Sequence, residues 1–396
     1  MRVCAVICEF DPLHLGHEHL LHSVREAGAE CIVCIMSGDF CQRGEPSSFD
    51  AHTRTKAALA AGADLVLELP FPYSCASAEF FAYGAVSIIK ALGGVDTLAF
   101  GCECADGEML SACAELLLSD EFSAKYDAVC KSEKQTGTAA QIQKALEALS
   151  PECASLLCGA NNTLAIEYIK AAKRTDTPLE IFPVARVGSG HGDMDEGARF
   201  ASASLIRQCV REGKDIRRYL PEASADIICE AVRGMPEPPS MKLAERAVIA
   251  HLRAADRNAP CAGGDGGLFN RLCDAADKAC SLDELFSLSK TKKYTDARLR
   301  RTIIFSMCRV TAEDLGHPPA YITLYGADSA GIRFLSERKK HIALPFISNP
   351  SMLSALRGEA LHQLELSKRA AALRAVMTSS MSPADSRLRI PPVIVK

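Results

Sequence analysis

The first twenty residues limit the possible folds more than any other stretch of the chain. Val3–Cys8 is a run of small or β-branched apolar residues, too short for a core helix, so we expect a strand buried on both faces, as in a parallel sheet. A turn containing Gly16 follows, and the apolar spacing from His17 to about Ala27 predicts a helix. His14 and His17 therefore lie where a strand passes into a helix. Unpaired amides and the helix dipole at such a junction favour an anion.

Predicted strands and helices alternate along the first half of the chain. Strand-like runs occur at residues 30–36, 64–68, 95–100 and 179–187, and helical runs at 52–61, 76–92 and 163–173. This alternation predicts an α/β fold with a Rossmann-like, doubly wound parallel sheet, whose binding sites lie at the carboxyl ends of the strands. The first turn lacks the G-x-G-x-x-G pattern, which argues against a nicotinamide or flavin dehydrogenase.

The remaining stretches suggest how the chain is divided. Residues 106–149 have the pattern of a mostly helical insertion, after which Asn161 or Asn162 is placed to cap the next helix. Beyond Arg207 the alternation stops, and helical stretches without strand patterns continue to about residue 378. We therefore expect a boundary near Gly213, with residues 1–213 as one domain and 214–396 as a second, mostly helical domain. The final segment, RLRIPPVIVK, supports no prediction.

Charge and cysteine content narrow the possible partners. The 396 residues include 45 Lys and Arg against 49 Asp and Glu, so a nucleic-acid site would have to be a local basic patch. Several of the 18 cysteines lie in apolar runs, where cysteine behaves as a small hydrophobe. Cys31 and Cys34 have CxxC spacing, but a strand directs them to opposite faces. Cys102 and Cys104 have no partner pair at zinc-ligand spacing.

We therefore expect free thiols, no metal-binding cluster and a reducing compartment. No signal peptide precedes the first strand, and no apolar run approaches the length of a membrane span. The expected location is the cytoplasm, without a membrane partner. Nothing in the pattern indicates an oligomeric state.

A second motif follows the last predicted strand of the sheet. Residues 201–207, ASASLIR, have a Ser-x-Ser-x-x-Arg form that opens a predicted helix. The hydroxyls of Ser202 and Ser204 and the guanidinium of Arg207 can bind phosphate oxygens there. Alternatively, Ser202 is only an N-cap and Arg207 a solvated charge. The histidine pair strengthens the first interpretation, because both motifs flank one predicted sheet.

These motifs resemble those of a known family. The spacing His14-Leu15-Gly16-His17 resembles the HxGH signature of nucleotidyltransferases, and ASASLIR resembles their second signature. Four further segments are similar, in the order in which they occur, to segments of the bacterial tRNA(Met) cytidine acetate ligases. They are residues 37–86, NNTLAIEYIKA, the strand ending in ARVGSG, and TKKYTDARLRR. The resemblance spans residues 1 to about 310. It implies that acetate is activated with ATP to acetyl-adenylate and then transferred to N4 of the wobble cytidine of elongator tRNA(Met).

The resemblance also implies a site. Carried over by position, the ATP pocket comprises Ile7, Cys8, Glu9, Phe10, Asp11, Pro12, Leu13, His14, Leu15, Gly16, His17, Glu18, His19, Leu20, Gly101, Asn162 and Arg186. His14, His17 and Arg186 are the expected catalytic residues, and Ser202, Ser204 and Arg207 are expected to hold the outer phosphates. ATP is expected as a substrate, together with Mg²⁺. Three positions where the family has asparagine differ here, namely Asp11, Leu15 and Asp39. Residues 188–193 nearly match a further family loop.

A basic segment is the candidate tRNA surface. Residues 290–301, KTKKYTDARLRR, hold six cations against one acid, and an aromatic ring among them is placed to stack on a base. The residues expected to bind tRNA are Lys290, Lys292, Lys293, Tyr294, Arg298, Arg300 and Arg301. The alternative is a solvated helix face, and the same choice applies to a second cluster, Arg333, Arg338, Lys339 and Lys340. Arg43 and Glu45 either face acetate or the cytidine or form ion pairs that fix their loop.

The residues alone leave two other functions as alternatives. A small-molecule adenylyl- or cytidylyltransferase would act on a phosphorylated acceptor, although such an enzyme needs little beyond the sheet domain. A catalytically silent RNA-binding protein would retain nucleotide only for structure. Asp11 and Asp39 keep that alternative open, because they add negative charge near a triphosphate.

Overall fold

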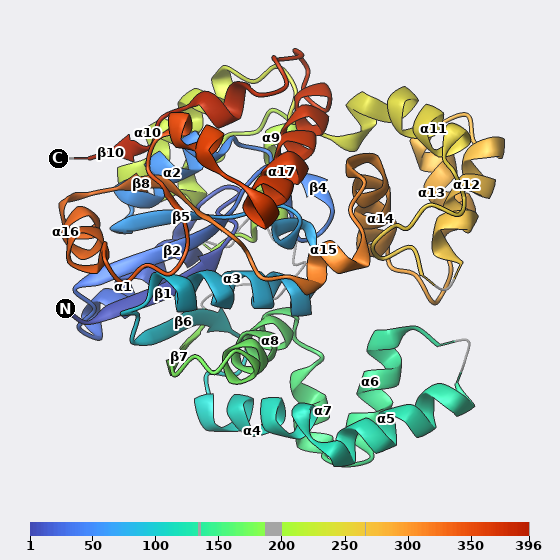
Figure 1. The fold of residues 1–396 in the computed structure, drawn as a ribbon, viewed down its shortest axis with the longest axis horizontal. Coiled ribbons are helices and arrows are strands. Elements are labelled where there is room, and N and C mark those ends of the chain that lie inside the picture. Colours follow the sequence, from blue (N-terminus) through green and yellow to red (C-terminus); the bar gives the residue numbers. More distant parts are fainter. Residues whose placement is uncertain (134–135, 187–199, 266, 396) are drawn as a thin grey trace.

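A mixed, mostly parallel sheet forms the centre of the molecule (Figure 1). The computed structural model describes residues 1–133, 136–186, 200–265 and 267–395. The strands follow the order β10-β8-β5-β2-β1-β6-β7. The parallel core comprises β1 (Val3–Cys8), β2 (Cys31–Ser37), β5 (Leu65–Leu69), β6 (Thr97–Cys102) and β7 (Glu180–Ala185). The predicted α/β fold is confirmed, and the first strand has the predicted bounds.

Helices cover both faces of the sheet, because alternate residues of its buried strands point to opposite sides. The odd-numbered residues of β1 belong to one apolar core and the even-numbered residues to another. The first core includes residues of α3 (Ala78–Leu92) and α8 (Ala160–Arg174). The second includes residues of α1 (Leu15–Glu26), α2 (Ala51–Ala60), α9 (Ala203–Arg211) and α10 (Glu222–Arg233). Cys31 and Cys34 lie in opposite cores, as predicted, and both are free thiols.

The C-terminal part of the chain returns to this sheet. β8 (Ile322–Ala327) pairs antiparallel with β5, and β9 (Phe346–Ile347) and β10 (Val393–Ile394) each pair parallel with β8. The expectation that residues 208–378 hold no strand is therefore wrong. The alternation of apolar and polar residues in the run ITLYGA covers only its first four residues, and β5, with which it pairs, is distant in the sequence. α16 (Ser329–Arg338) and α17 (Gly358–Val376) belong to the same part of the chain.

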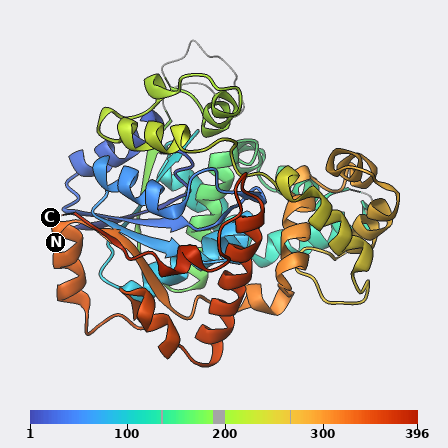
Figure 2. The same ribbon diagram turned by 90° about the horizontal axis from the view of Figure 1, so that it is seen from above.

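Two groups of helices extend from the sheet (Figures 1 and 2). The predicted helical insertion contains α4 (Gly107–Leu118), α5 (Asp120–Ser132), α6 (Thr138–Glu147) and α7 (Pro151–Leu156). The second group, called the helical module below, contains α11 (Glu245–Ala254), α12 (Leu268–Lys278), α13 (Leu282–Ser289) and α14 (Asp296–Cys308). Its apolar core also takes in Phe40 and Phe71 from the first half of the chain. The boundary near Gly213 stays a prediction.

One loop of the first half carries a small hairpin. The β2–α2 loop (residues 38–50) contains β3 (Phe40–Cys41) and β4 (Glu45–Pro46), which pair antiparallel. The remaining elements are short, namely η1 (Tyr73–Cys75), η2 (Arg217–Tyr219), η3 (Met241–Ala244), α15 (Ala312–Gly316), η4 (Pro350–Ala355) and η5 (Ser386–Arg389). Among the described residues, no helix combines the length and the apolar character that crossing a lipid bilayer requires.

Candidate active site

A cavity of about 670 Å³ lies at the carboxyl ends of β1 and β6. Its volume is that of a site for a small organic ligand. It is lined by the β1–α1 turn, the β2–α2 loop, α8, the start of α9 and the start of α14. Among the described residues, the charged side chains of its wall are Arg43, Arg186, Arg207, Arg301, Glu9 and Asp11. With four guanidinium groups and two carboxylates, the cavity suits a polyanion despite the acidic total charge of the chain.

His14 and His17 stack against each other in the cavity wall, with ring centroids 3.8 Å apart. His14 is the N-cap of α1, and its Nδ1 accepts the backbone N–H of Gly16 at 3.1 Å. His17 Nδ1 accepts the backbone N–H of His14 at 3.3 Å. These two hydrogen bonds assign the proton of each neutral ring to Nε2. Each imidazole therefore keeps one N–H group for a ligand.

The surroundings keep both imidazoles uncharged. Burial, aided by the charges of Arg186 and Arg207, lowers the pKa of His14 to about 3. Burial and the neighbouring His14 lower the pKa of His17 well below its ordinary value. Neutral rings can donate hydrogen bonds to phosphate oxygens while the arginines supply the positive charge.

The second motif meets the first at the same cavity. Ser202 is the N-cap of α9, and its Oγ accepts the backbone N–H of Leu205 at 3.2 Å. Arg207 is not a solvated charge, because its Nη1 donates to the carbonyl oxygen of Asp11 at 2.8 Å and its Nη2 to Ser204 Oγ at 3.3 Å. The structure thus joins the two motifs through the turn that carries the histidines.

Most of the residues predicted to bind ATP line this cavity. They are Ile7, Cys8, Glu9, Phe10, Asp11, His14, Gly16, His17, Leu20, Gly101, Arg186, Ser202, Ser204 and Arg207. Pro12 and Leu13 are buried nearby, and Leu15, Glu18 and His19 lie on α1 without lining the cavity. The contact of each residue with ATP stays a prediction. The loop at residues 188–193 and the end of the predicted fifth strand, Val187, lie outside the described residues.

Asn162 does not line the cavity but binds the backbone next to it. Its Oδ1 accepts the backbone N–H groups of Glu103 at 3.0 Å and Cys104 at 2.9 Å, which fixes the turn after β6. α8 begins at Ala160 with Gly159 as its N-cap, so the predicted asparagine cap is wrong. Asn161 lines the cavity instead. A side chain bound to the backbone of another element leaves no local pattern, so sequence reasoning missed this exchange of roles.

Asp11 is satisfied by the protein itself. Its Oδ2 accepts the backbone N–H of Ser48 at 2.8 Å, and its Oδ1 accepts that of Phe49 at 3.0 Å. These bonds attach the β2–α2 loop to the β1–α1 turn. The carboxylate at this position therefore fixes two walls of the cavity to each other.

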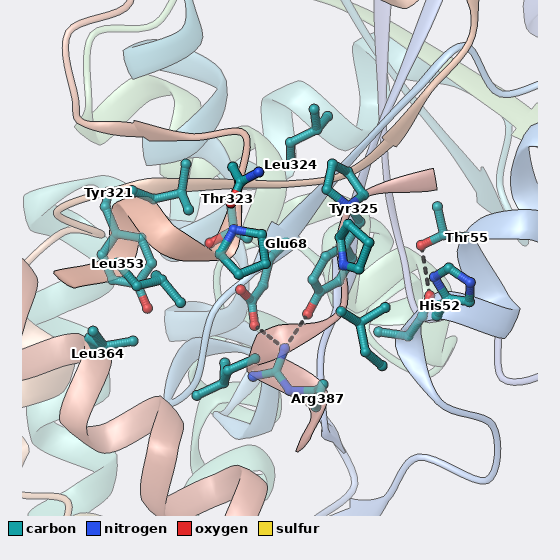
Figure 3. A pocket seen from close by; sticks show the side chains of 18 residues that line it. His52, Thr55, Glu68, Tyr321, Thr323, Leu324, Tyr325, Leu353, Leu364 and Arg387 are labelled. Atoms are coloured by element: carbon teal, nitrogen blue, oxygen red, sulfur yellow. Dashed lines mark hydrogen bonds and ion pairs between the residues drawn. The ribbon is translucent and has the colours of Figure 1, made fainter. Parts of the chain in front are cut away.

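Asp39 lies outside the cavity, which corrects the expectation that it adds charge beside a triphosphate. Its Oδ2 is 2.7 Å from Nε of Arg387, a residue of η5 whose side chain is 15% exposed. Arg387 Nη1 also donates to Glu68 Oε1 at 3.0 Å and to the Tyr325 hydroxyl at 2.9 Å (Figure 3). The C-terminal segment, for which the sequence supported no prediction, thus neutralises two buried carboxylates.

The predicted tRNA-binding residues divide into two groups. Lys290 and Lys292 are exposed and Lys293 is half-buried, whereas Tyr294 is only 7% exposed. Lys293 Nζ and Arg298 Cζ lie over the Tyr294 ring, so in this structure the ring is not available to stack on a base. Arg298 also pairs with Asp265 at 2.8 Å.

Arg300 and Arg301 form the second group and face the β2–α2 loop. Arg301 lines the cavity, which the basic pattern of its segment did not indicate. Glu45 lies 3.6 Å from Arg300 and therefore forms the loop-fixing ion pair that was one of its two interpretations. Arg43 does line the cavity, as the other interpretation required.

Comparison with known proteins agrees with this geometry. The model of the family described as HIGH Nucleotidyl Transferase matches residues 1–387. The chain is 36% identical to the tRNA(Met) cytidine acetate ligase of Syntrophotalea carbinolica over 362 residues, which cover 89% of this chain and 86% of that protein. It is 33% identical to the tRNA(Met) cytidine acetate ligase of Acetivibrio thermocellus, with 88% of each chain covered.

Solved structures show the same fold. The crystal structure of apo Thermotoga maritima TmcAL matches with a TM-score of 0.92 and 28% identity over 100% of both chains. A second form, bound with alpha-thio ATP, matches with a TM-score of 0.90 and 28% identity over 100% of this chain and 99% of that one. The two joined motifs, the matched family model and these relatives show that the chain belongs to the tRNA(Met) cytidine acetate ligase family of the HIGH nucleotidyl transferases.

Proposed function

We propose that the chain is an ATP-dependent acetate ligase that modifies elongator tRNA(Met). A carboxylate oxygen of acetate attacks the α-phosphorus of ATP, the bond from that phosphorus to the bridging oxygen breaks, and pyrophosphate leaves. N4 of the wobble cytidine then attacks the carbonyl carbon of acetyl-adenylate. AMP leaves and the nitrogen loses one proton, which yields N4-acetylcytidine. The observation that carries this proposal is the convergence of the HxGH and ASASLIR motifs on one cationic cavity.

Neither step needs a covalent enzyme intermediate, so positioning and charge neutralisation carry the catalysis. In this proposal His14 and His17 donate Nε2–H to phosphate oxygens and Arg186 binds the α-phosphate. Ser204 and Arg207, at the start of α9, hold the leaving pyrophosphate. The bond from Arg207 to the carbonyl oxygen of Asp11 sets the distance between this anion site and the histidine pair.

ATP as the nucleotide is supported by the structural relative that is bound with alpha-thio ATP. In the proposal Mg²⁺ arrives with ATP and is held chiefly by phosphate oxygens and water, with one or two protein carboxylates at most. The cavity fits such an ion, because Glu9 and Asp11 are its only carboxylates among the described residues. Glu9 Oε1 accepts the backbone N–H of Gln42 at 2.7 Å, and Asp11 is bound by two amides.

The helical module is the proposed tRNA-binding part of the predicted second domain. Lys290, Lys292 and Lys293 precede α14, and the start of α14 lines the cavity. A tRNA bound at these lysines therefore lies close to the proposed acetyl-adenylate. The second basic cluster is on α16 and just after it, at the opposite end of the molecule from α14 in both views (Figures 1 and 2). We assign it no part in this contact, and a tRNA substrate implies that the reaction occurs in the cytoplasm.

The test is exchange of labelled pyrophosphate into ATP by the purified chain without tRNA. We expect exchange only when acetate is present, and transfer of labelled acetate to tRNA(Met) when that tRNA is added. Exchange that ignores acetate would indicate a nucleotidyltransferase with another acceptor. No exchange under any condition would indicate an RNA-binding protein without adenylation activity. Either result would overturn the proposal.

A further inference from the structure

α14 binds the backbone of the β2–α2 loop through two neighbouring arginines. Arg300 Nε donates to the carbonyl oxygen of Arg43 at 3.1 Å, and Arg301 Nη1 donates to that of Gln42 at 2.9 Å. Arg300 Nη2 also lies 3.6 Å from Glu45 Oε1. Gln42 and Arg43 belong to the turn of the β3–β4 hairpin, and Glu45 is the first residue of β4. Two side chains of the basic segment are therefore used to hold a loop.

Gly44 shows how closely the helix and this turn approach each other. Gly44 has a φ of +72°, and a Cβ built there would lie 2.7 Å from the backbone nitrogen of Arg301 and 2.8 Å from Arg300 Cβ. These distances leave no space for a side chain, and the φ itself favours glycine. The turn and α14 are thus in direct contact, so a displacement of one displaces the other.

The same turn connects the two motifs of the active site. The backbone N–H of Gln42 donates to Glu9 Oε1 at 2.7 Å, and Arg43 Nη1 donates to Ser204 Oγ at 3.1 Å. Glu9 precedes the HxGH motif, and Ser204 belongs to ASASLIR. Gln42, Arg43 and both of these partners line the cavity. The position of the turn therefore sets the position of groups on two sides of the bound nucleotide.

Arg301 also forms part of the cavity wall itself. Burial lowers the pKa of its guanidinium, and no carboxylate among the described residues forms an ion pair with it. Arg301 is half-buried, and withdrawing a cation from water without a counterion is costly. An anionic ligand in the cavity would offset that cost, which gives Arg301 a reason to lie there that tRNA binding does not supply.

We propose that Arg300 and Arg301 belong to the adenylation site and not to the tRNA surface. Arg300 is a positioning residue that holds the Gln42–Arg43 turn, and Arg301 both holds the turn and presents its guanidinium to the anionic substrate. This inference rests on the proposed function, because it assigns the two arginines to the first of its two steps. It divides the basic segment: its first three lysines meet tRNA, and its last two arginines act before tRNA is bound.

The decisive experiment is the tRNA-free exchange assay on Arg300→Gln and Arg301→Gln. For Arg300→Gln we expect kcat to fall about tenfold or more, because a misplaced wall disturbs the reacting groups. For Arg301→Gln we expect the KM for ATP to rise about tenfold, the effect of losing one charge-assisted hydrogen bond. The conservative variants Arg300→Lys and Arg301→Lys keep the charge and should recover part of each loss. Wild-type exchange in both glutamine variants, with weakened tRNA binding, would overturn the proposal.

Arg253 provides a matched control within the helical module. Its Nε and Nη2 donate to the carbonyl oxygens of Ala276 and Ala279, the same kind of contact without any link to the loop. Arg253→Gln should leave exchange unchanged, and an equal loss there would show a general weakening of the module and overturn the proposal. If the glutamine variants do not fold, the lysine variants provide the test. A lower kcat for Arg300→Lys and a higher KM for ATP for Arg301→Lys are then the expected results.

A binding measurement separates this inference from the proposed function. Calorimetry with a non-hydrolysable ATP analogue reports on Arg301 even if the wild-type protein shows no acetate-dependent exchange. Weaker binding by Arg301→Lys and Arg301→Gln, with wild-type affinity in Arg253→Gln, would support the assignment of Arg301. Unchanged affinity in both Arg301 variants would contradict it.

Discussion

His14 and His17 each use one ring nitrogen for the fold and leave the other for a ligand. Their Nδ1 atoms accept backbone N–H groups at the start of α1, which prevents either ring from turning freely. The donors are therefore oriented before a substrate arrives, and no reorganisation is needed when charge develops on the leaving group. The proposed catalytic pair and the helix cap are the same two side chains.

Replacing either histidine by alanine should remove adenylation without removing tRNA binding. We expect His14→Ala and His17→Ala each to lower the exchange rate by about a hundredfold or more, the effect of losing one preorganised donor. Exchange assays and tRNA gel-shift measurements on the same preparations test this. His22→Ala, at an exposed position of α1, is the control. Loss of tRNA binding together with exchange would mean that the histidines are only structural.

The buried histidines should also make stability depend on pH. The unfolded chain binds protons at histidine below about pH 6.5, whereas His14 in the folded protein binds one only near pH 3. The contribution of the neutral histidines to the free energy of unfolding is therefore fully present above pH 6.5, and it falls as the pH is lowered toward 3. We expect the urea midpoint to drop between pH 7.5 and pH 5, and His14→Asn to reduce that drop. His22→Asn should keep the wild-type dependence, and an equal slope in all three proteins would refute the prediction.

Three of the residues that sequence reasoning found have hydrogen-bond partners in their own segment. The bonds of His14, His17 and Ser202 all close within one turn of a helix, so a local pattern reveals them. Asn162 and Arg301 bind the backbone of distant elements, and their roles depend on packing that no local pattern encodes. This explains why Asn162 was expected in the cavity and Arg301 on the tRNA surface.

Among the elements, the β2–α2 loop is held by arginines from widely separated parts of the chain. Arg54 of α2 is fully buried and donates to the carbonyl oxygen of Ser37, just before the loop, at 2.9 Å. Arg374 of α17 donates to the carbonyl oxygen of Ser47 at 2.9 Å. Arg387 pairs with Asp39, and α14 supplies two more contacts. A loop fixed in this way can serve as a rigid wall of the active site.

Removing Arg387 should destabilise the whole fold. Asp39 and Glu68 have side chains only 5% and 4% exposed, and Arg387→Ala would leave both buried without a cation. We expect the free energy of unfolding in urea to fall by about 3–5 kcal/mol. Adding Asp39→Asn should recover part of the loss, because it removes one of the two uncompensated charges.

Arg389 offers a control from the same segment. Its ion pair with Asp385 is exposed, at 76% and 47% for the two side chains, so Arg389→Ala should have little effect on the unfolding free energy. A wild-type urea midpoint for Arg387→Ala would show that the buried contacts do not support the loop.

The strands of the parallel core were predictable because each is a mostly apolar run between turn residues. β1, β2, β5, β6 and β7 all lie within two residues of their expected bounds. β8 was not predictable, because its run is mixed in polarity and its pairing with β5 is non-local. The physical signal for such a strand is the open edge of β5, which only a three-dimensional arrangement reveals.

On the scale of the whole molecule, the proposed function requires an acidic protein to bind polyanionic substrates through separate cationic regions. Among the described residues, the cavity collects four arginines from distant segments, and the exposed lysines before α14 form a second region on the helical module. The formal net charge of −4 therefore limits non-specific attraction to nucleic acid without weakening either site.

Replacing Lys292 and Lys293 by alanine should weaken tRNA binding and reduce its salt dependence. Each lost phosphate contact should lower the slope of log affinity against log salt by about 1. Filter binding at several salt concentrations measures this. The control is Arg333→Ala with Lys339→Ala, in the cluster at the far end of the molecule (Figures 1 and 2), which should leave the slope unchanged. Identical slopes for the wild type, the lysine variant and the control would show that Lys292 and Lys293 do not contact tRNA.

The antiparallel pairing of β8 with β5 has a consequence for synthesis. β5 ends at Leu69, but the strand that covers its outer edge is complete only at Ala327. At ordinary translation speeds, a nascent chain keeps the apolar edge LVLEL open for on the order of tens of seconds. Such an edge is a template for pairing between neighbouring polypeptides on one messenger. Shielding by a ribosome-associated chaperone would protect this protein most during that interval.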